Sequence, residues 1–343
     1  MCSLNLFFVK KKNNLKRYKK IFFNYIVGPV LFTWLTYSIY KQILRQPDLP
    51  KAWHSIIESL YTASSWRLYV VFILMFVNWG LEARKWQLLV AHVQKISFFR
   101  AYRAIFTGQA IALNTLNGMG EYVGRVVYLE DGNRIRAISL SIIGSLSQII
   151  VTMVLGLTGL FFVKYTVLSD LNMLQGLSKF WLNGFMYALS LGTMIIVVFY
   201  FNLSWITKLL EKIPFVAKYS FYIQKIEDFH WKELTKILIL SFIRYIVFVI
   251  QYLLLLQLFH VEADMLNLVW MVCILFLVLA VVPTIPVAEL GLRGEASKQL
   301  FGLLSTNALG IVFTAVFIWL INRVLPAIAG SLFILGVRLF KSK

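Results

Sequence analysis

Residues 137–163, AISLSIIGSLSQIIVTMVLGLTGLFFV, contain no aspartate, glutamate, lysine or arginine. A transmembrane helix needs about 20 consecutive, mainly apolar residues. This stretch is therefore long and apolar enough to cross a bilayer. Arg136 and Lys164 flank it directly, as expected where a span meets the lipid headgroups.

The whole composition extends this membrane prediction. Hydrophobic residues make up 59% of the chain, charged residues 14%, and the mean hydropathy is +0.75; these values exclude an ordinary soluble domain. The formal net charge of +19 is spread over the ends of the hydrophobic runs, so we expect no nucleic-acid partner. Two separated cysteines and four scattered histidines predict no disulfide framework, no metal site and no cofactor.

The hydrophobic runs predict an all-α polytopic membrane protein of about eight transmembrane helices. Segment 100–118 is shorter and semi-polar, which favours a re-entrant or interfacial element. The last two runs meet around Arg323 and Pro326, so we expect a tight helical hairpin there. The expected spans are 21–40, 66–83, 137–163, 181–203, 237–259, 265–286, 306–322 and 325–340.

We expect one integral membrane domain over residues 1–343, with a basic tail at 1–20 and a helical bundle at 21–343. The run 21–40 is too long for a signal-peptide core and lacks a cleavage site, so we expect it to be retained. With this layout 26 of the 34 lysines and arginines fall on one side and 7 on the other, while Arg244 lies within a span. The positive-inside rule then places both termini in the cytoplasm, and the default location is a bacterial cytoplasmic membrane.

Two polar clusters interrupt the apolar sequence. The first is NTLNGMGEYVGR at 114–125 and the second is PTIPVAELGLRGE at 283–295. Ionisable residues at membrane depth are costly and survive where they line a cavity or pair with one another. Both clusters combine charge with glycine or proline, which loosen or break a helix. We therefore expect broken, re-entrant hairpins that carry two Gly-Glu/Arg motifs.

Within these clusters the charges have helical spacing. Glu121 and Arg125 are four residues apart, so on a helix they share a face and can neutralise each other. The second cluster holds Glu289, Arg293 and Glu295. Glu121 and Glu295 are separated by about half the chain, which suggests a weak internal duplication of the kind that places broken helices at a shared midplane site.

The paired clusters resemble the membrane region of the lysylphosphatidylglycerol synthase family. The first follows the pattern T-P-N-x-x-G-E-x-x-G-R, with Leu116 in place of proline and Gly118 in place of a polar residue. The second follows P-x-P-x-x-E/G-x-G-x-R-x-E. The residues kept are Thr115, Asn117, Gly120, Glu121, Gly124, Arg125, Pro286, Glu289, Gly291, Arg293 and Glu295.

The resemblance covers most of the chain and implies a flippase, which moves a lipid or a lipid-linked substrate across the membrane. The synthase part of full-length relatives has no counterpart in this sequence, so lipid aminoacylation is not implied. We accordingly expect a transporter and not an enzyme, with no catalytic residues. The expected partner is a membrane phospholipid or lipid-linked substrate, and assembly into a homo-oligomer is left open.

For the candidate binding site, Arg125 and Arg293 would engage a phosphate. Glu121, Glu289 and Glu295 would position these arginines or meet a cationic headgroup. The alternative is that all five residues form internal salt bridges that hold two hairpins together.

Asn117 and Arg244 complete the candidate set. Arg244 lies inside a span, where it either faces the bundle and pairs with a motif glutamate or snorkels to the interface. Glu82 is a weaker candidate, and its neighbour Lys85 is expected to be an interfacial anchor. Three amides would line the same cavity or bridge helices: Gln109, Asn114 and Gln148.

Two other functions remain open. A membrane-embedded transferase needs a nucleophile, a base or metal-binding carboxylates, but the sequence has no Asp-x-Asp and no metal-ligand spacing. A non-transporting scaffold of a cell-envelope complex is the third hypothesis.

Overall fold

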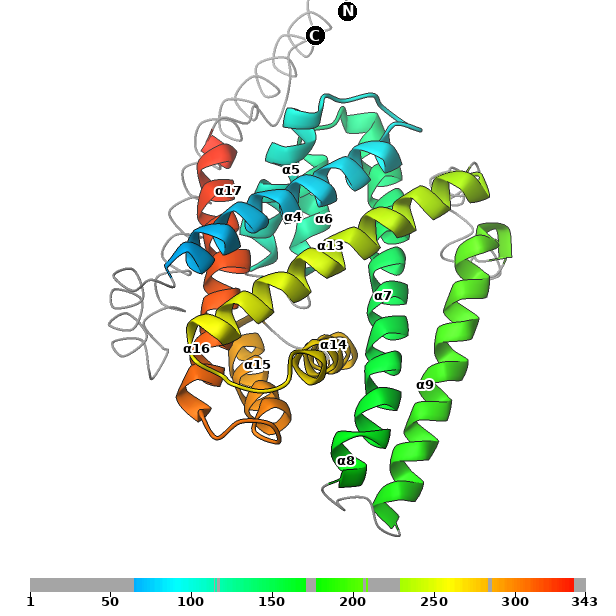
Figure 1. The fold of residues 1–343 in the computed structure, drawn as a ribbon. Coiled ribbons are helices and arrows are strands. Elements are labelled where there is room, and N and C mark those ends of the chain that lie inside the picture. The colour runs from blue at the N-terminus through cyan, green and yellow to red at the C-terminus, as the bar shows by residue number, and fades with distance from the viewer. Residues whose placement is uncertain are drawn as a thin grey trace, which may run out of the picture.

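The computed structural model describes residues 65–113, 115, 118–170, 177–205, 208, 229–282 and 286–335. Every regular element in this part of the chain is a helix (Figure 1). The helices are α4 (Trp66–Val90), α5 (Phe98–Ala112), α6 (Gly120–Val126), η3 (Asp131–Asn133), α7 (Arg134–Tyr165), α8 (Val167–Asp170), α9 (Leu177–Phe201), α13 (Trp231–Leu258), α14 (Met265–Val281), α15 (Pro286–Phe301), α16 (Ala308–Trp319), the π-helical η5 (Leu320–Val324) and α17 (Leu325–Leu335).

The all-helical, multi-pass membrane architecture is confirmed. Within the described residues, five helical segments are long and apolar enough to cross a membrane. Four of them match the expected spans at 66–83, 137–163, 181–203 and 237–259, whereas the tail at 1–20 and the span at 21–40 lie outside the described residues. The five segments are Trp66–Val90, Asp131–Ser169, Lys179–Phe201, Trp231–Leu258 and Ala308–Ile334.

The expected hairpin near Arg323 is wrong, because α16, η5 and α17 form one continuous helix. Pro326 has no N–H to donate and would normally interrupt a helix. The turn just before it is π-helical, and the N–H of Leu325 bonds to the carbonyl of Leu320, five residues earlier. This wider turn accommodates the proline, so the described residues of the last two expected runs form one helical segment, Ala308–Ile334.

Helices α5 and α6 form a helical hairpin in the region where the sequence predicts a re-entrant or interfacial element. The chain enters after α4 and returns before α7, and the two connections touch each other. The N–H of Glu130 donates to the side chain of Gln94 at 3.1 Å, and Arg100 donates to the carbonyl of Tyr128. Entry and exit therefore lie at the same end of the bundle.

Helices α14 and α15 form a second helical hairpin. The side chain of Asn307, just before α16, donates to the carbonyl of Phe259 at 2.9 Å and to that of His260 at 3.1 Å. The chain thus leaves the hairpin at the end of the bundle where it entered, and the full crossing expected at 265–286 is not among the five described segments that are long and apolar enough to cross a membrane. Helix α14 has only 17 residues, which is short for a crossing of about 20 residues.

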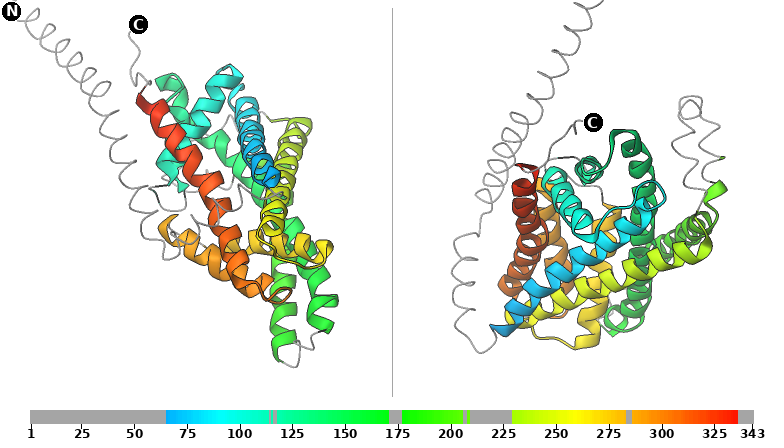
Figure 2. Two further views of the ribbon diagram at one scale, coloured as in Figure 1. Left: turned by 60° about the vertical axis from the view of Figure 1, so that its left-hand side comes forward. Right: turned by 90° about the horizontal axis from the view of Figure 1, so that it is seen from above.

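The two hairpins enter from opposite ends of the bundle. Helices α4 and α13 pack together and run antiparallel (Figures 1 and 2): Arg67 at the start of α4 donates to Gln257 at the end of α13 at 3.3 Å. At the other end His92, just after α4, lies 3.2 Å from Glu233 in the first turn of α13. A long helix, a hairpin and another long helix thus occur twice with opposite orientation, as in inverted-repeat transporters.

These two differences from the expected span layout do not change the end of the bundle that the last helix reaches. The run expected at 265–286 lies in a hairpin that returns to the end where it began, and the two runs after it form one helix. The last turn of α17 therefore reaches the end of the bundle where α5 begins. Phe333 lies 6.2 Å from Phe106 between ring centroids, and Arg103 lies over the Phe333 ring. Lys298 lies at the opposite end of the bundle, in the last turn of α15 close to the start of α16.

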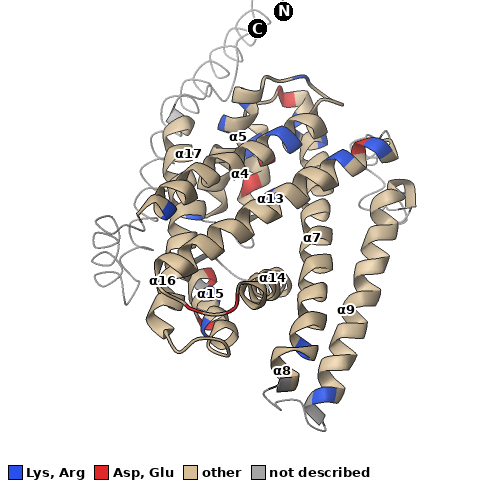
Figure 3. Cartoon of the chain, viewed as in Figure 1, with Lys and Arg blue, Asp and Glu red and all other residues tan. Residues whose placement is uncertain are grey.

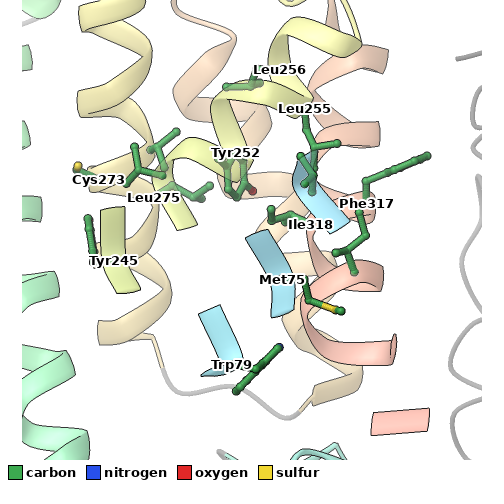
Figure 4. Close-up of a cluster of buried hydrophobic side chains, with 14 of the residues drawn as sticks. Met75, Trp79, Tyr245, Tyr252, Leu255, Leu256, Cys273, Leu275, Phe317 and Ile318 are labelled. Carbon is green, nitrogen blue, oxygen red and sulfur yellow. The ribbon is translucent and has the colours of Figure 1, made fainter. Parts of the chain in front are cut away.

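The apolar core lies between α4, α13, α14 and the α16–α17 helix (Figure 4). Tyr252 on α13 is buried there, with its ring 5.7 Å from that of Phe276 in an edge-on arrangement. Met75 and Ile318 contribute from α4 and α16 (Figure 4). This packing holds the two halves of the protein together and leaves the polar residues to one side of it.

Two glycines bring α5 and α6 into backbone contact. A Cβ atom at Gly124 would lie 2.6 Å from the Cα of Gly108 and 2.8 Å from the carbonyl oxygen of Thr107. At the hairpin tip Gly118 adopts a positive φ of 68°, which L side chains rarely adopt. The glycines of the first motif therefore set the geometry of this hairpin.

We expect Gly124→Ala to destabilise the protein by about 1–3 kcal/mol, because the added methyl group overpacks a backbone contact. Thermal unfolding of the purified protein in detergent measures the change. Gly184→Ala on α9 is the matched control, since a Cβ there meets nothing within 4 Å. Equal unfolding temperatures for the two variants would contradict the close approach.

Candidate functional site

A cavity of about 680 Å³ lies between the two hairpins. Both hairpin tips reach it, through Gly118 of the first and Val282 of the second, and the long helices complete its walls. Many charged residues lie near helix ends, but several occur along the middle of helices (Figure 3). The charged residues that line the cavity are Glu82, Lys85, Glu121, Arg125, Arg244, Glu289, Arg293 and Arg323.

Glu82 on α4 is the centre of one ion-pair network. Its carboxylate lies 2.8 Å from Lys85 Nζ, 2.9 Å from Arg125 Nη2 and 3.2 Å from Arg244 Nη1. The Glu82 side chain is only 5% exposed. One buried carboxylate thus connects α4 with α6 and α13 through charge-assisted contacts, which are stronger than neutral hydrogen bonds.

The first motif joins this network. Arg125 contacts Glu121, one turn earlier on α6, as well as Glu82. The expected pairing of Glu121 with Arg125 is therefore confirmed. Arg125 is nearly buried, whereas Glu121 is partly exposed, so the glutamate is the more accessible member of the pair.

The second motif forms a separate network. Arg293 Nη2 lies 2.9 Å from Glu289 Oε1 on the same helix, and Arg323 Nη2 lies 3.5 Å from the same oxygen. Arg323 also donates to Gln109 on α5 at 3.3 Å. The second hairpin is thereby connected to the first hairpin through the π-helical turn.

Arg244 faces the interior of the bundle, so the snorkelling alternative is excluded. It donates to Asn78 at 2.8 Å and to Gln148 at 3.2 Å, and it lies about 5 Å from the ring centres of Trp79 and Phe248. Its carboxylate partner is Glu82 and not a glutamate of either motif.

Five of the seven candidate site residues line the cavity: Glu121, Arg125, Arg244, Glu289 and Arg293. Glu295 does not, because it lies two residues beyond Arg293, about 200° around the helix. It is 60% exposed and contacts Lys298 and Gln299 instead. Asn117 and Asn114 lie outside the described residues, while Gln109 and Gln148 line the cavity as expected.

The geometry also revises the suggested internal duplication. The structural counterpart of the Glu121–Arg125 pair is Glu289–Arg293, since each is an i,i+4 ion pair on the returning helix of its hairpin. Glu295 has no such role. The two motifs therefore correspond through Glu121 and Glu289, and not through Glu121 and Glu295 as the sequence suggested.

Two cavity residues were missed by the sequence interpretation. Lys85 is not an interfacial anchor: it is 2% exposed and donates to the Gly144 carbonyl and to Ser241, each at 3.2 Å. Arg323 was assigned to a loop, yet it lies in mid-helix. In both cases the sequence feature that could have identified the cavity residue was a basic residue next to or within an apolar run.

The site can bind a ligand that offers hydrogen-bond acceptors or negative charge. Guanidinium groups recognise phosphate and carboxylate oxygens in a fixed, often bidentate geometry. No group of three or more histidine, cysteine, aspartate or glutamate side chains suited to a metal ion occurs among the described residues.

Fold and site together define the class: a polytopic helical membrane protein in which two helical hairpins from opposite ends of the bundle enclose a charged cavity. The family model "Lysylphosphatidylglycerol synthase TM region" matches residues 25–333. The match covers nearly the whole chain, so the protein belongs to this family. Comparison with curated proteins gave no match.

We expect Glu82→Gln to destabilise the protein strongly, by about 3–5 kcal/mol, because it leaves Lys85, Arg125 and Arg244 buried with too little opposite charge. Unfolding in detergent, followed by tryptophan fluorescence, measures this loss. Glu295→Gln is the control, since exposed ion pairs contribute at most about 1 kcal/mol. If Glu82→Gln unfolds like the wild type, Glu82 does not organise the site.

Proposed function

We propose that the protein is a flippase that carries a lipid or lipid-linked substrate across the cytoplasmic membrane. The observation that carries this proposal is the charged cavity between two oppositely inserted hairpins, in a chain of the lysylphosphatidylglycerol synthase membrane-region family. A lipid headgroup needs such a polar passage, because charged groups are costly in the hydrocarbon region.

The cavity wall is suited to a molecule with both polar and apolar parts. Beside the charged residues it includes Ile149, Val281 and Val282, which are 39%, 43% and 39% exposed. These apolar side chains adjoin the hairpin tips, so the headgroup would enter the cavity there while the acyl chains stay in contact with lipid.

The opposite insertion of the hairpins supports a transport cycle. In inverted-repeat transporters, movement of one repeat against the other opens a central site to alternate sides of the membrane. Here the ion pairs of Arg323 with Glu289 and of Arg125 with Glu82 connect each hairpin to a long helix. We propose that these contacts rearrange as the substrate passes.

We propose transport without a catalytic step. Each of the three carboxylates in the cavity lies within ion-pair distance of at least one lysine or arginine: Glu82, Glu121 and Glu289. Carboxylates paired in this way hold the lysine and arginine side chains in position. A site that binds acidic groups requires cations held in this manner.

We further propose that the end of the bundle formed by the α4–α5 connection and the end of α17 faces the cytoplasm. Basic residues are frequent at this end and sparse at the other, in line with the positive-inside rule. At the first end lie Arg84, Lys95, Arg100, Arg103, Arg134, Arg136, Lys232 and Lys236; at the other lie Arg67, Lys164, Lys179 and Lys298.

This orientation predicts the labelling pattern of two single cysteines in a Cys2→Ser background, where the remaining Cys273 is buried. In intact cells a membrane-impermeant maleimide should label Thr306→Cys, and it should label Gly132→Cys only after permeabilisation. The reverse pattern would invert the proposed orientation. Labelling of both from one side would contradict the arrangement of the hairpins.

The function itself is tested by lipid translocation in proteoliposomes, followed by dithionite quenching of an acyl-labelled fluorescent phospholipid. We expect Arg293→Gln to lower the translocation rate at least about tenfold, since a hydrogen bond to a charged group contributes about 1.5–3 kcal/mol and a factor of ten corresponds to about 1.4 kcal/mol.

Lys298→Gln is the matched control for this experiment. It removes the same charge from the same helix, but Lys298 lies outside the cavity and is 49% exposed. A folded Arg293→Gln variant that moves lipid at the wild-type rate would contradict the proposed function.

A further inference from the structure

The charges of the cavity do not balance. Among the described residues, its walls carry five lysine or arginine side chains and three carboxylates. On one side Glu82 and Glu121 face Lys85, Arg125 and Arg244; on the other, Glu289 alone faces Arg293 and Arg323. Each of the two networks is therefore one negative charge short.

We propose that the missing charge belongs to the ligand, which is a phosphate-bearing molecule of net negative charge, and that Arg323 is its primary anchor. This inference rests on the proposed function in that it takes the cavity as the headgroup site. Buried cations are stable when an anion pairs with them, so an anionic headgroup satisfies the cavity better than a zwitterionic or cationic one.

Arg323 is the most accessible of the cavity cations. Its side chain is 36% exposed, whereas those of Arg244 and Arg293 are 12% and 13% exposed. Its ion pair with Glu289 is also the longest in the cavity, at 3.5 Å. Lys85 and Arg125 are held at shorter distances and are almost fully buried. Arg323 therefore has the greatest capacity to receive a new oxygen ligand.

Hydrogen-bond donors next to Arg323 lack acceptors. Gln109 accepts from Arg323 through Oε1, and its buried Nε2 has no hydrogen-bond partner. The indole Nε1 of Trp319, one turn before Arg323 on the same helix, is likewise buried without a partner. Gln109 and Trp319 are 2% and 1% exposed and line the cavity. Buried donors normally have acceptors, and phosphate oxygens would supply them.

The local backbone supports the same assignment. Arg323 lies within η5, the π-helical turn of the described residues. Such turns occur often at functional sites. The sequence of the turn, LINRV, places Arg323 in an otherwise apolar helix, where a charged side chain is costly unless it has a role.

Lipid binding by the purified protein in detergent tests the inference, with phosphatidylglycerol and phosphatidylcholine as probes in native mass spectrometry. We expect the wild type to retain phosphatidylglycerol preferentially. Arg323→Gln should reduce this preference about tenfold, or about 1.4 kcal/mol, and Arg323→Lys should retain part of it because it keeps the charge. Lys298→Gln should leave the preference unchanged.

A second variant covers the case in which Arg323→Gln does not fold. Gln109→Met removes the neighbouring donor, together with the oxygen that accepts from Arg323, without changing charge, and it should weaken phosphatidylglycerol retention by a smaller factor. Equal retention of the two lipids by the wild type would overturn the inference, as would an unchanged preference in folded Arg323→Gln.

Competition with glycerol 3-phosphate separates the two sources of the phosphate. No displacement at millimolar concentration supports a lipid ligand. Displacement by the soluble compound would keep the Arg323 anchor but contradict the proposed lipid transport. Conversely, translocation without headgroup preference in the proteoliposome assay would keep the proposed function and refute the anionic-ligand inference.

Discussion

The structure depends on the sharing of one buried carboxylate by three cations. Glu82 binds Lys85 from its own helix, Arg125 from the first hairpin and Arg244 from α13. In an apolar interior none of these cations is stable alone, since an unpaired buried charge is strongly destabilising. The carboxylate therefore requires α4, α6 and α13 to meet at one place. The first hairpin is held in the membrane by this requirement and by the close contact between Gly108 and Gly124.

In the second hairpin, too, one carboxylate pairs with cations from different helices, but here there are two cations and not three. Glu289 holds Arg293 on its own helix and Arg323 from the π-helical turn of the final span. The two hairpins thus use one design, an i,i+4 glutamate–arginine pair on the returning helix, and insert from opposite ends. Between them the positive charges exceed the negative ones, so the cavity remains an incomplete set of ion pairs. A site of this kind is suited to an acidic ligand, because the ligand completes the charge balance.

Sequence patterns predicted much of the architecture and part of the site. Apolar runs located four of the five long spans, and the semi-polar segment before the first motif was distinguished from a full crossing. The differences occurred at α14 and at the α16–α17 helix. The run 265–286 was assigned as a full crossing, and the runs 306–322 and 325–340 were assigned as two crossings. Run length does not decide these cases, since the contacts of Asn307 show where the chain leaves the second hairpin and the π-helical turn before Pro326 lets the last helix continue. Lys85 and Arg323 were missed because interfacial and buried basic residues have the same local sequence context.

The sequence by itself determined that this is a multi-pass membrane protein, that it belongs to the lysylphosphatidylglycerol synthase membrane-region family, and that Glu121 pairs with Arg125. These conclusions rest on hydrophobicity, motif identity and helical spacing, which are local properties of the chain. Only the tertiary structure decided that the chain leaves the second hairpin near the point where it enters, that Glu82 is the common partner of three cations, and that Glu295 lies outside the cavity. Ion pairs such as Glu82 with Arg244 join residues that are far apart in the sequence. Their formation is set by how helices pack, and no local pattern encodes it.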